Sequence, residues 1–102
     1  MGLNRMLFKN SKKDDFILYL ERTIETFKDD NIDSIGDYAF GYCTSLTSID
    51  LPNATSIGDY AFRYCTSLTS IHFASQNKET IEALSGYSSK FGATNATIYF
   101  DL

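Results

Sequence analysis

The chain has 102 residues, which is enough for one domain, and 43% of them are hydrophobic and 15% aromatic. This content supports a folded core and argues against a disordered chain. The formal net charge of −4 argues against a nucleic-acid partner, and no apolar run approaches the ~20 residues of a membrane span.

The first segment of the single domain, residues 1–33, is expected to form an N-terminal cap. Residues 1–13 are basic but lack the roughly 7–15-residue apolar stretch of a secretory signal. We therefore expect a cytoplasmic location in the host, or a virion-associated one, in preference to Sec-dependent secretion. We expect this segment to be a partly ordered arm, with Leu7 and Phe8 packed on the repeats.

A short helix is expected over Asp14–Arg22, capped by Asp14 or Asp15. Ile17, Leu20 and Ile24 recur at spacings of three and four residues, which is typical of one helical face. The chain is then expected to turn into a first strand that ends near residue 27.

Residues 34–73 contain two copies of one unit with a period of 22 residues. Between Ser34–Ile49 and Ser56–Ile71 the copies differ at one position, where Gly41 is matched by Arg63. A fixed period of this length is typical of a solenoid. The spacing Leu46-x-x-Ile49-x-Leu51 predicts a strand whose alternate side chains point inward.

The first copy reads Ile-Gly-x-x-Ala-Phe-x-x-Cys-x-x-Leu-x-x-Ile-x-Leu-Pro from Ile35 to Pro52. This pattern resembles the BspA-like, or Treponema-type, leucine-rich repeat. The second copy departs from it at its end, where Phe73-Ala74 replaces Leu-Pro. The resemblance implies an α/β repeat solenoid, a short leucine-rich-repeat array with degenerate helical caps at both ends.

Residues 74–102 are expected to form the C-terminal cap. Asn77 is expected to cap a helix over Lys78–Ser85, with Gly86 as its stop. Asn95–Leu102 predicts a closing strand that places Tyr99 beside His72, a longer step along the chain than the repeat period because the cap carries an insertion. An edge strand with few charges favours self-association, so a homo-oligomer is one possible assembly.

Cys43 and Cys65 lie one period apart. Neighbouring strands lie ~4.8 Å apart, which is within the range of Cα separations that a disulfide allows. We favour buried thiols that fill a core position, and the disulfide is the alternative. Two cysteines without further ligands do not form a zinc site, so no metal is expected.

Asp37 and Asp59 precede Tyr-Ala-Phe in the two copies, in phase with Asp15. A carboxylate there can accept hydrogen bonds from backbone N–H groups and begin a single helical turn. A metal-binding or acid–base role for this column is the less favoured alternative.

One row of residues is expected on the outer face of the strands: Lys28, Asp50, His72 and Tyr99. We predict that this row binds a partner, and plain solvent exposure is an equally good interpretation. Asp50 beside His72 also suggests a hydrolase, which is the least favoured hypothesis because neither Ser48 nor Ser70 has a recognisable oxyanion arrangement. No catalytic residue is therefore predicted.

Two tyrosine columns complete the candidate sites. Tyr38 and Tyr60 are predicted to be exposed and to bind a partner, because exposed tyrosines offer a large contact area at small entropic cost. For Tyr42 and Tyr64, exposure and packing against the neighbouring repeat are equally compatible with the sequence.

The resemblance also implies a function, because BspA-like repeats occur in surface and secreted proteins of gut and oral bacteria that bind host proteins. Similar short units look like those of phage proteins. We therefore predict a non-enzymatic, cofactor-free module of a bacterium or its phage that recognises a protein through its exposed strand face. One alternative is a free-standing phage inhibitor of a host defence protein such as a nuclease, and another is a structural component of a virion or cell surface.

Overall fold

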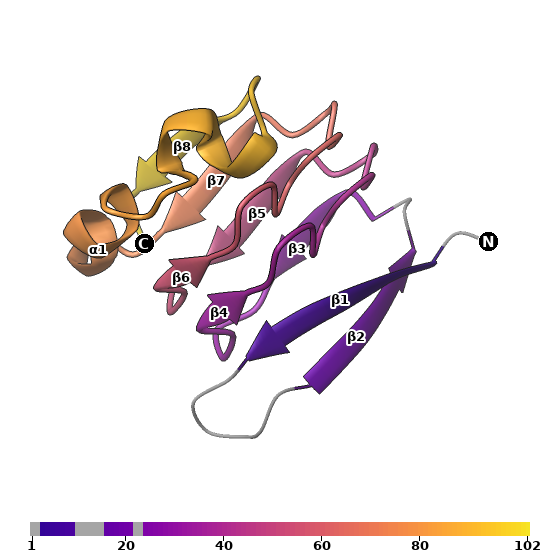
Figure 1. Cartoon of the computed structure of the whole chain (residues 1–102), viewed down its shortest axis with the longest axis horizontal. Coiled ribbons are helices and arrows are strands. Elements are labelled where there is room, and N and C mark those ends of the chain that lie inside the picture. Colours follow the sequence, from indigo (N-terminus) through magenta and orange to yellow (C-terminus); the bar gives the residue numbers. More distant parts are fainter. Residues whose placement is uncertain (1–2, 10–15, 22–23) are drawn as a thin grey trace.

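The computed structural model describes residues 3–9, 16–21 and 24–102, with side chains from residue 24 onward. The described part consists of short strands joined by turns, with short helices near its C-terminal end (Figure 1). The strands are β1 (Leu3–Lys9), β2 (Phe16–Glu21), β3 (Thr26–Lys28), β4 (Ser34–Ile35), β5 (Ser48–Leu51), β6 (Ser56–Ile57), β7 (Ser70–Phe73) and β8 (Thr97–Phe100). The helices are η1 (Ser75–Asn77), α1 (Lys78–Glu82) and η2 (Tyr87–Gly92).

The strands form two four-stranded sheets, in the orders β2-β1-β4-β6 and β3-β5-β7-β8. All neighbours in the second sheet are parallel, and β4 is parallel to β6. Asp50 pairs with His72, which confirms the repeat period, and His72 pairs with Tyr99, which confirms the longer step to the closing strand. Figure 1 shows β4 and β6 in front of β5 and β7, so the repeats contribute to two layers.

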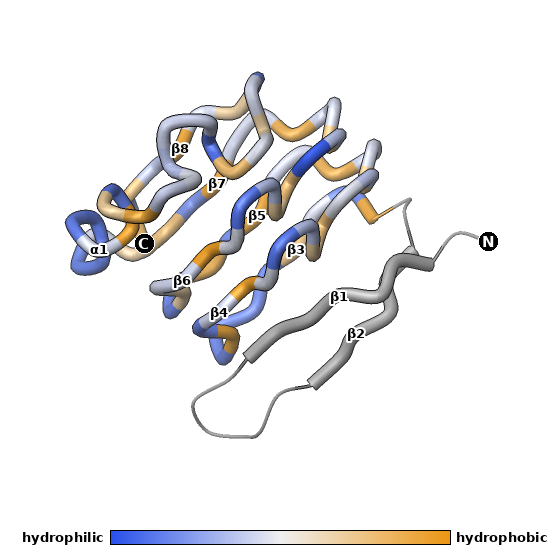
Figure 2. Tube along the Cα trace, viewed as in Figure 1, coloured by the Kyte–Doolittle hydropathy of each residue, from blue (hydrophilic) through white to orange (hydrophobic). Residues whose placement is uncertain are grey.

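The core lies between these layers. In β5 and β7 buried and half-buried residues alternate, and Ile49, Leu51, Ile71 and Phe73 are fully buried. Figure 2 shows hydrophobic stretches recurring at matching places in successive units. Since the strand period is two, a residue between two inward ones must face outward, and this rule places the candidate residues on the outer face.

A ladder of phenylalanines joins one unit to the next. The ring centroids of Phe27 and Phe40 lie 5.2 Å apart, and those of Phe40 and Phe62 lie 5.4 Å apart. The backbone N–H of Phe40 donates to the carbonyl of Ala61 over 2.7 Å. Each unit therefore supplies both an apolar surface and hydrogen-bond acceptors to its neighbour, as stacked repeats require.

The expected helix over Asp14–Arg22 is wrong, because Phe16–Glu21 forms β2 instead. β2 pairs antiparallel with β1, and β1 pairs antiparallel with β4. The run Phe-Ile-Leu-Tyr-Leu combines high strand propensity with a short continuous apolar stretch, for which helix-like spacing is a poor guide. The N-terminal part is thus a hairpin rather than a helical cap.

Two further N-terminal expectations can be placed only in part. Leu7 and Phe8 belong to β1, and Phe8 pairs with Ile35 of β4, so this stretch is a strand where a partly ordered arm was expected. The packing of these two side chains, and the proposed capping by Asp14 or Asp15, lie outside the described residues.

The helix expected after Asn77 is present but shorter, since α1 covers Lys78–Glu82. The predicted cap is wrong, because the Asn77 side chain caps nothing in α1. Its Nδ2 instead donates to the carbonyl of Ala54 over 3.4 Å, one unit back. No helix in the described part of the chain is long and apolar enough to cross a membrane.

The aspartate column also acts differently from the expectation. Asp37 Oδ1 accepts the backbone N–H of Asp59 over 2.9 Å, and Asp59 Oδ1 accepts the hydroxyl of Ser85 over 3.0 Å. The expected helical turn is replaced by turns in which Tyr38 has φ of 60° and Tyr42 has φ of 64°. Each carboxylate therefore links its unit to the next one.

Candidate functional site

The parallel register brings the four predicted strand residues together. Lys28 pairs with Asp50, Asp50 pairs with His72, and His72 pairs with Tyr99. We call these four residues the strand row. Because neighbouring strands lie ~4.8 Å apart, the strand row extends over about 14 Å.

Within the strand row, His72 is held on two sides. Its Nδ1 lies 2.9 Å from Asp101 Oδ1 and 3.1 Å from Asp101 Oδ2. Its ring stacks on Tyr99, with centroids 4.8 Å apart and planes inclined by 12°. A stacked and hydrogen-bonded imidazole has a fixed orientation, so this part of the surface is preorganised.

Sequence reasoning missed Asp101, because it paired His72 with Asp50 on the neighbouring strand. Extending the register of β7 and β8 one position past Phe73 and Phe100 would have placed Asp101 at the strand end. Among the described residues, no hydroxyl or thiol hydrogen bonds to His72. The pair therefore lacks the nucleophile of a catalytic triad in this part of the chain.

Both cysteines are buried thiols, and no disulfide joins them. The Sγ of Cys65 donates to the carbonyl of Phe40 over 2.9 Å. A hydrogen bond with Cys43, together with desolvation, raises the pKa of Cys65 above its ordinary value. In residues 24–102, no three His, Cys, Asp or Glu side chains are grouped so that they could hold a metal ion.

The tyrosines form a second candidate surface. Tyr38 stacks on Tyr60 with centroids 5.5 Å apart, and Tyr42 stacks on Tyr64 with centroids 4.7 Å apart. All four are exposed, from 43% for Tyr60 to 53% for Tyr38. The predicted exposure of Tyr38 and Tyr60 is confirmed, and for the other pair the structure shows both exposure and stacking between repeats.

Arg63 belongs to the same surface. Its guanidinium carbon lies 5.0 Å from the ring centroid of Tyr60 and 4.8 Å from that of Tyr64. Its Nη2 donates to the Tyr64 hydroxyl over 3.0 Å, and this hydrogen bond raises the pKa of Arg63. We call the four tyrosines and Arg63 the tyrosine patch.

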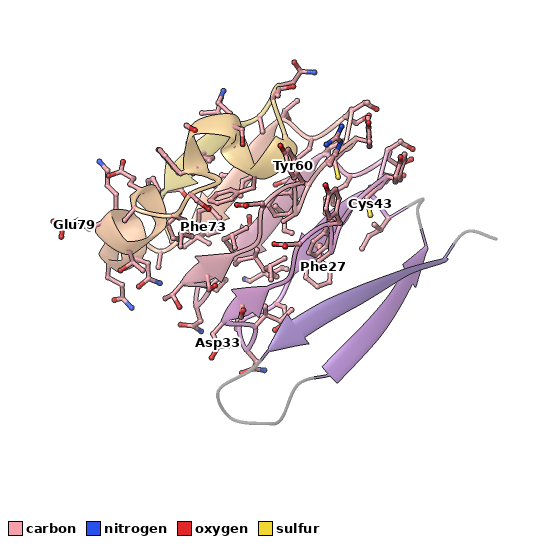
Figure 3. All side chains as sticks on the ribbon, viewed as in Figure 1. Phe27, Asp33, Cys43, Tyr60, Phe73 and Glu79 are labelled. Atoms are coloured by element: carbon pink, nitrogen blue, oxygen red, sulfur yellow. The ribbon has the colours of Figure 1, made fainter. Side chains whose placement is uncertain are left out.

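Sequence reasoning did not select Arg63, although it is the one difference between Ser34–Ile49 and Ser56–Ile71. The tyrosine patch lies on the turns that follow β4 and β6, which belong to the first sheet. The strand row belongs to the second sheet. Figure 3 places Tyr60 in front of the strands of that sheet, so the predicted site residues form two surfaces rather than one.

The comparison with family models now identifies the repeat. The model of a BspA-type leucine-rich repeat region (6 copies) matches residues 5–93. The chain belongs to this family. Neither the curated proteins nor the solved structures contain a match. Membership in the BspA-type family suggests a protein-interaction module, and such repeats are generally not enzymes.

The BspA-type pattern also separates the residues that build the fold from the rest. Its fixed apolar positions, such as Phe40 and Cys43, are fully buried. Tyr38 and Tyr42 occupy positions that the pattern leaves variable, and both are exposed. These tyrosines are therefore not required by the repeat itself.

Proposed function

We propose that this chain is a solenoid-type, non-enzymatic recognition module that binds a protein partner through the strand row. The observation that carries the proposal is the register that aligns Lys28, Asp50, His72 and Tyr99 on adjacent parallel strands. A partner docked on this face contacts four consecutive strands at once. The setting we propose is a bacterium or its phage.

The chemistry of the strand row suits recognition of a protein. Lys28 and Asp50 supply opposite charges at fixed separation, which favours partners with the complementary arrangement. Tyr99 is 43% exposed and supplies an aromatic contact area. His72 is already ordered by Asp101 and Tyr99, so its side chain loses little entropy when a partner binds.

The test uses the substitution Asp50→Lys, which reverses the charge at the centre of the strand row. Glu82→Lys is the matched control, because it makes the same change in charge at an exposed position of α1. Wild type and both variants are immobilised, a bacterial lysate is passed over each, and retained proteins are quantified by mass spectrometry. Thermal unfolding shows that the variants are folded.

We expect a protein that wild type and Glu82→Lys retain equally and that Asp50→Lys retains at least about tenfold less, as for loss of an interface hot spot. Equal retention by all three chains contradicts binding through the strand row. Retention of no protein by wild type contradicts the protein-binding function itself.

A further inference from the structure

The four tyrosines of the tyrosine patch have a backbone conformation that is strained for bulky residues. Tyr38, Tyr42, Tyr60 and Tyr64 have φ between 58° and 64°. Positive φ is uncommon outside glycine, asparagine and aspartate, and for a bulky residue it stores strain. The repeat pattern leaves all four positions variable, so the fold does not impose tyrosine there.

The stacking of the tyrosines preorders the surface. Each ring of the first copy packs on its counterpart in the second, with planes inclined by 25° and 24°. Because the rings stack on one another and remain about half exposed, they present an aromatic surface in a fixed arrangement. A preordered aromatic surface binds a partner at small entropic cost.

Arg63 gives this surface a positive charge that the described residues do not neutralise. The guanidinium lies over two tyrosine rings, and none of the described carboxylates forms an ion pair with it. The carboxylates of Asp37 and Asp59 accept hydrogen bonds from the next unit. A planar guanidinium held in place is well suited to pair with a carboxylate through two parallel hydrogen bonds.

A small cavity adjoins one corner of the tyrosine patch. Its volume is about 70 Å³, which is more than one ordered water needs. It offers room for a small side chain beside the arginine–tyrosine contact. Its lining residues are Tyr64, Cys65, Thr66, Gly92, Thr94 and Asn95.

We propose that the tyrosine patch is a second protein-docking surface, which binds an acidic segment of a partner protein. A carboxylate of that segment pairs with Arg63, and the apolar groups beside it pack against the tyrosine rings. The local charge of the patch favours an acidic partner, since Arg63 is a cation without an ion-pair partner among the described residues. This surface belongs to the first sheet and does not depend on the strand row.

The two repeat copies provide their own test variants. Arg63→Gly makes Ser56–Ile71 identical to Ser34–Ile49, and Gly41→Arg places a second arginine at the equivalent position. A Cβ at Gly41 would lie 3.1 Å from the carbonyl oxygen of Tyr38, so the two groups must separate by a few tenths of an ångström. Each substitution therefore introduces the residue that the other copy has at the equivalent position.

The experiment selects binders from a displayed library of random peptides against wild type. We expect selected peptides to be enriched in Asp and Glu next to apolar residues. Their affinity falls at least about tenfold with Arg63→Gly and rises with Gly41→Arg, because each substitution changes the number of arginines that pair with a carboxylate. Replacing the Asp or Glu of a selected peptide by Asn or Gln is expected to lower the affinity by the same factor as Arg63→Gly does.

Failure to select any peptide overturns the proposal, as does selection of peptides without acidic residues. Unchanged affinity in Arg63→Gly overturns it too. Light scattering tests a second copy of the chain as the occupant, and a dimer that Arg63→Gly dissociates contradicts binding of a different partner protein. Asp50→Lys is expected to leave the affinity of these peptides unchanged. Failure of the tyrosine-patch proposal can therefore be told apart from failure of the proposed binding through the strand row.

Discussion

The second repeat copy and the C-terminal segment, residues 74–102, are consecutive layers of one stack but are built differently. Only the copy has the repeat motif, and the segment contains α1 and η2 in place of a motif. The step along the chain between paired strands becomes longer at this boundary, because these helices lie between β7 and β8. The register nevertheless stays in phase, so Ile71 pairs with Ile98 as it pairs with Ile49 on its other side.

The segment keeps the contacts that the preceding copy needs. The backbone N–H of Phe62 donates to the carbonyl of Phe91 over 2.9 Å, as that of Phe40 donates to the carbonyl of Ala61 over 2.7 Å. The Phe91 side chain is fully buried, although its φ is 54°. A stack therefore requires a carbonyl acceptor and an inward apolar group at each layer, and different sequences can supply them.

The largest expected effect comes from removing one ring in each region. Phe40→Ala removes a ring packed between Phe27 and Phe62 and lowers the free energy of unfolding by about 4–5 kcal/mol. Phe91→Ala lowers it by about 3 kcal/mol, because a segment at the end of the stack can collapse into the space. Urea denaturation of both variants measures the difference, and an equal or larger loss for Phe91→Ala contradicts this comparison.

The next largest effect on stability is expected at two glycines, Gly58 in the second copy and Gly86 in the C-terminal segment. A Cβ at Gly58 would clash with the backbone N–H and the carboxylate of Asp37 and would lie 2.6 Å from the carbonyl carbon of Gly36. A Cβ at Gly86 would lie 3.0 Å from both Asp59 Oδ1 and Phe91 Cδ1, which are side-chain atoms. Gly58 therefore faces backbone atoms of the preceding layer, whereas Gly86 faces side-chain atoms that can move.

We therefore expect Gly58→Ala to lower the free energy of unfolding by about 2–3 kcal/mol, since overpacking against backbone is not relieved. Gly86→Ala is expected to cost less than about 1 kcal/mol. The same urea titration compares the two variants. Equal losses would mean that the C-terminal segment is as rigid as the repeats.

The regular part of the fold was predictable because it depends on one period. The spacing of residues such as Ile49 and Leu51 determines which side chains face inward, and the same arithmetic aligned the strand row. The position of the closing strand followed from its match to the preceding strand. The sequence pattern of the repeat was sufficient to name the family.

The irregular parts were not predictable in the same way. Phe16–Glu21 has spacings that fit a helix or a strand, and only its pairing with β1 decides between them. The hydrogen bonds of Asp37 and Asn77 connect different units, whereas capping rules consider one element at a time. The contact of His72 with Asp101 also joins two units, and it follows from the register of β7 and β8 rather than from any local pattern.

The smallest expected effect at neutral pH concerns Cys65, which lies at the boundary between the second copy and the C-terminal segment. Its pKa is raised in the folded protein, whereas an unfolded thiol titrates near its ordinary value of 9.0. Below that pH both states keep the proton and the stabilisation is complete. As the pH rises above about 9, only the unfolded state loses the proton, so stability falls by about 1.4 kcal/mol per pH unit.

Cys65→Ser removes this titration, because a serine hydroxyl does not ionise in that range, and it preserves a donor for the carbonyl of Phe40. Urea denaturation of both proteins between about pH 8 and 10.5 gives the difference in slope, since tyrosine and lysine titrations are common to the two. A steeper loss of stability in wild type shows that the hydrogen bond with Cys43, together with burial, keeps the proton on this thiol. Equal slopes would show that water reaches Cys65 through the cavity beside Gly92 and Thr94, and that the irregular last layer seals the stack less well than a repeat does.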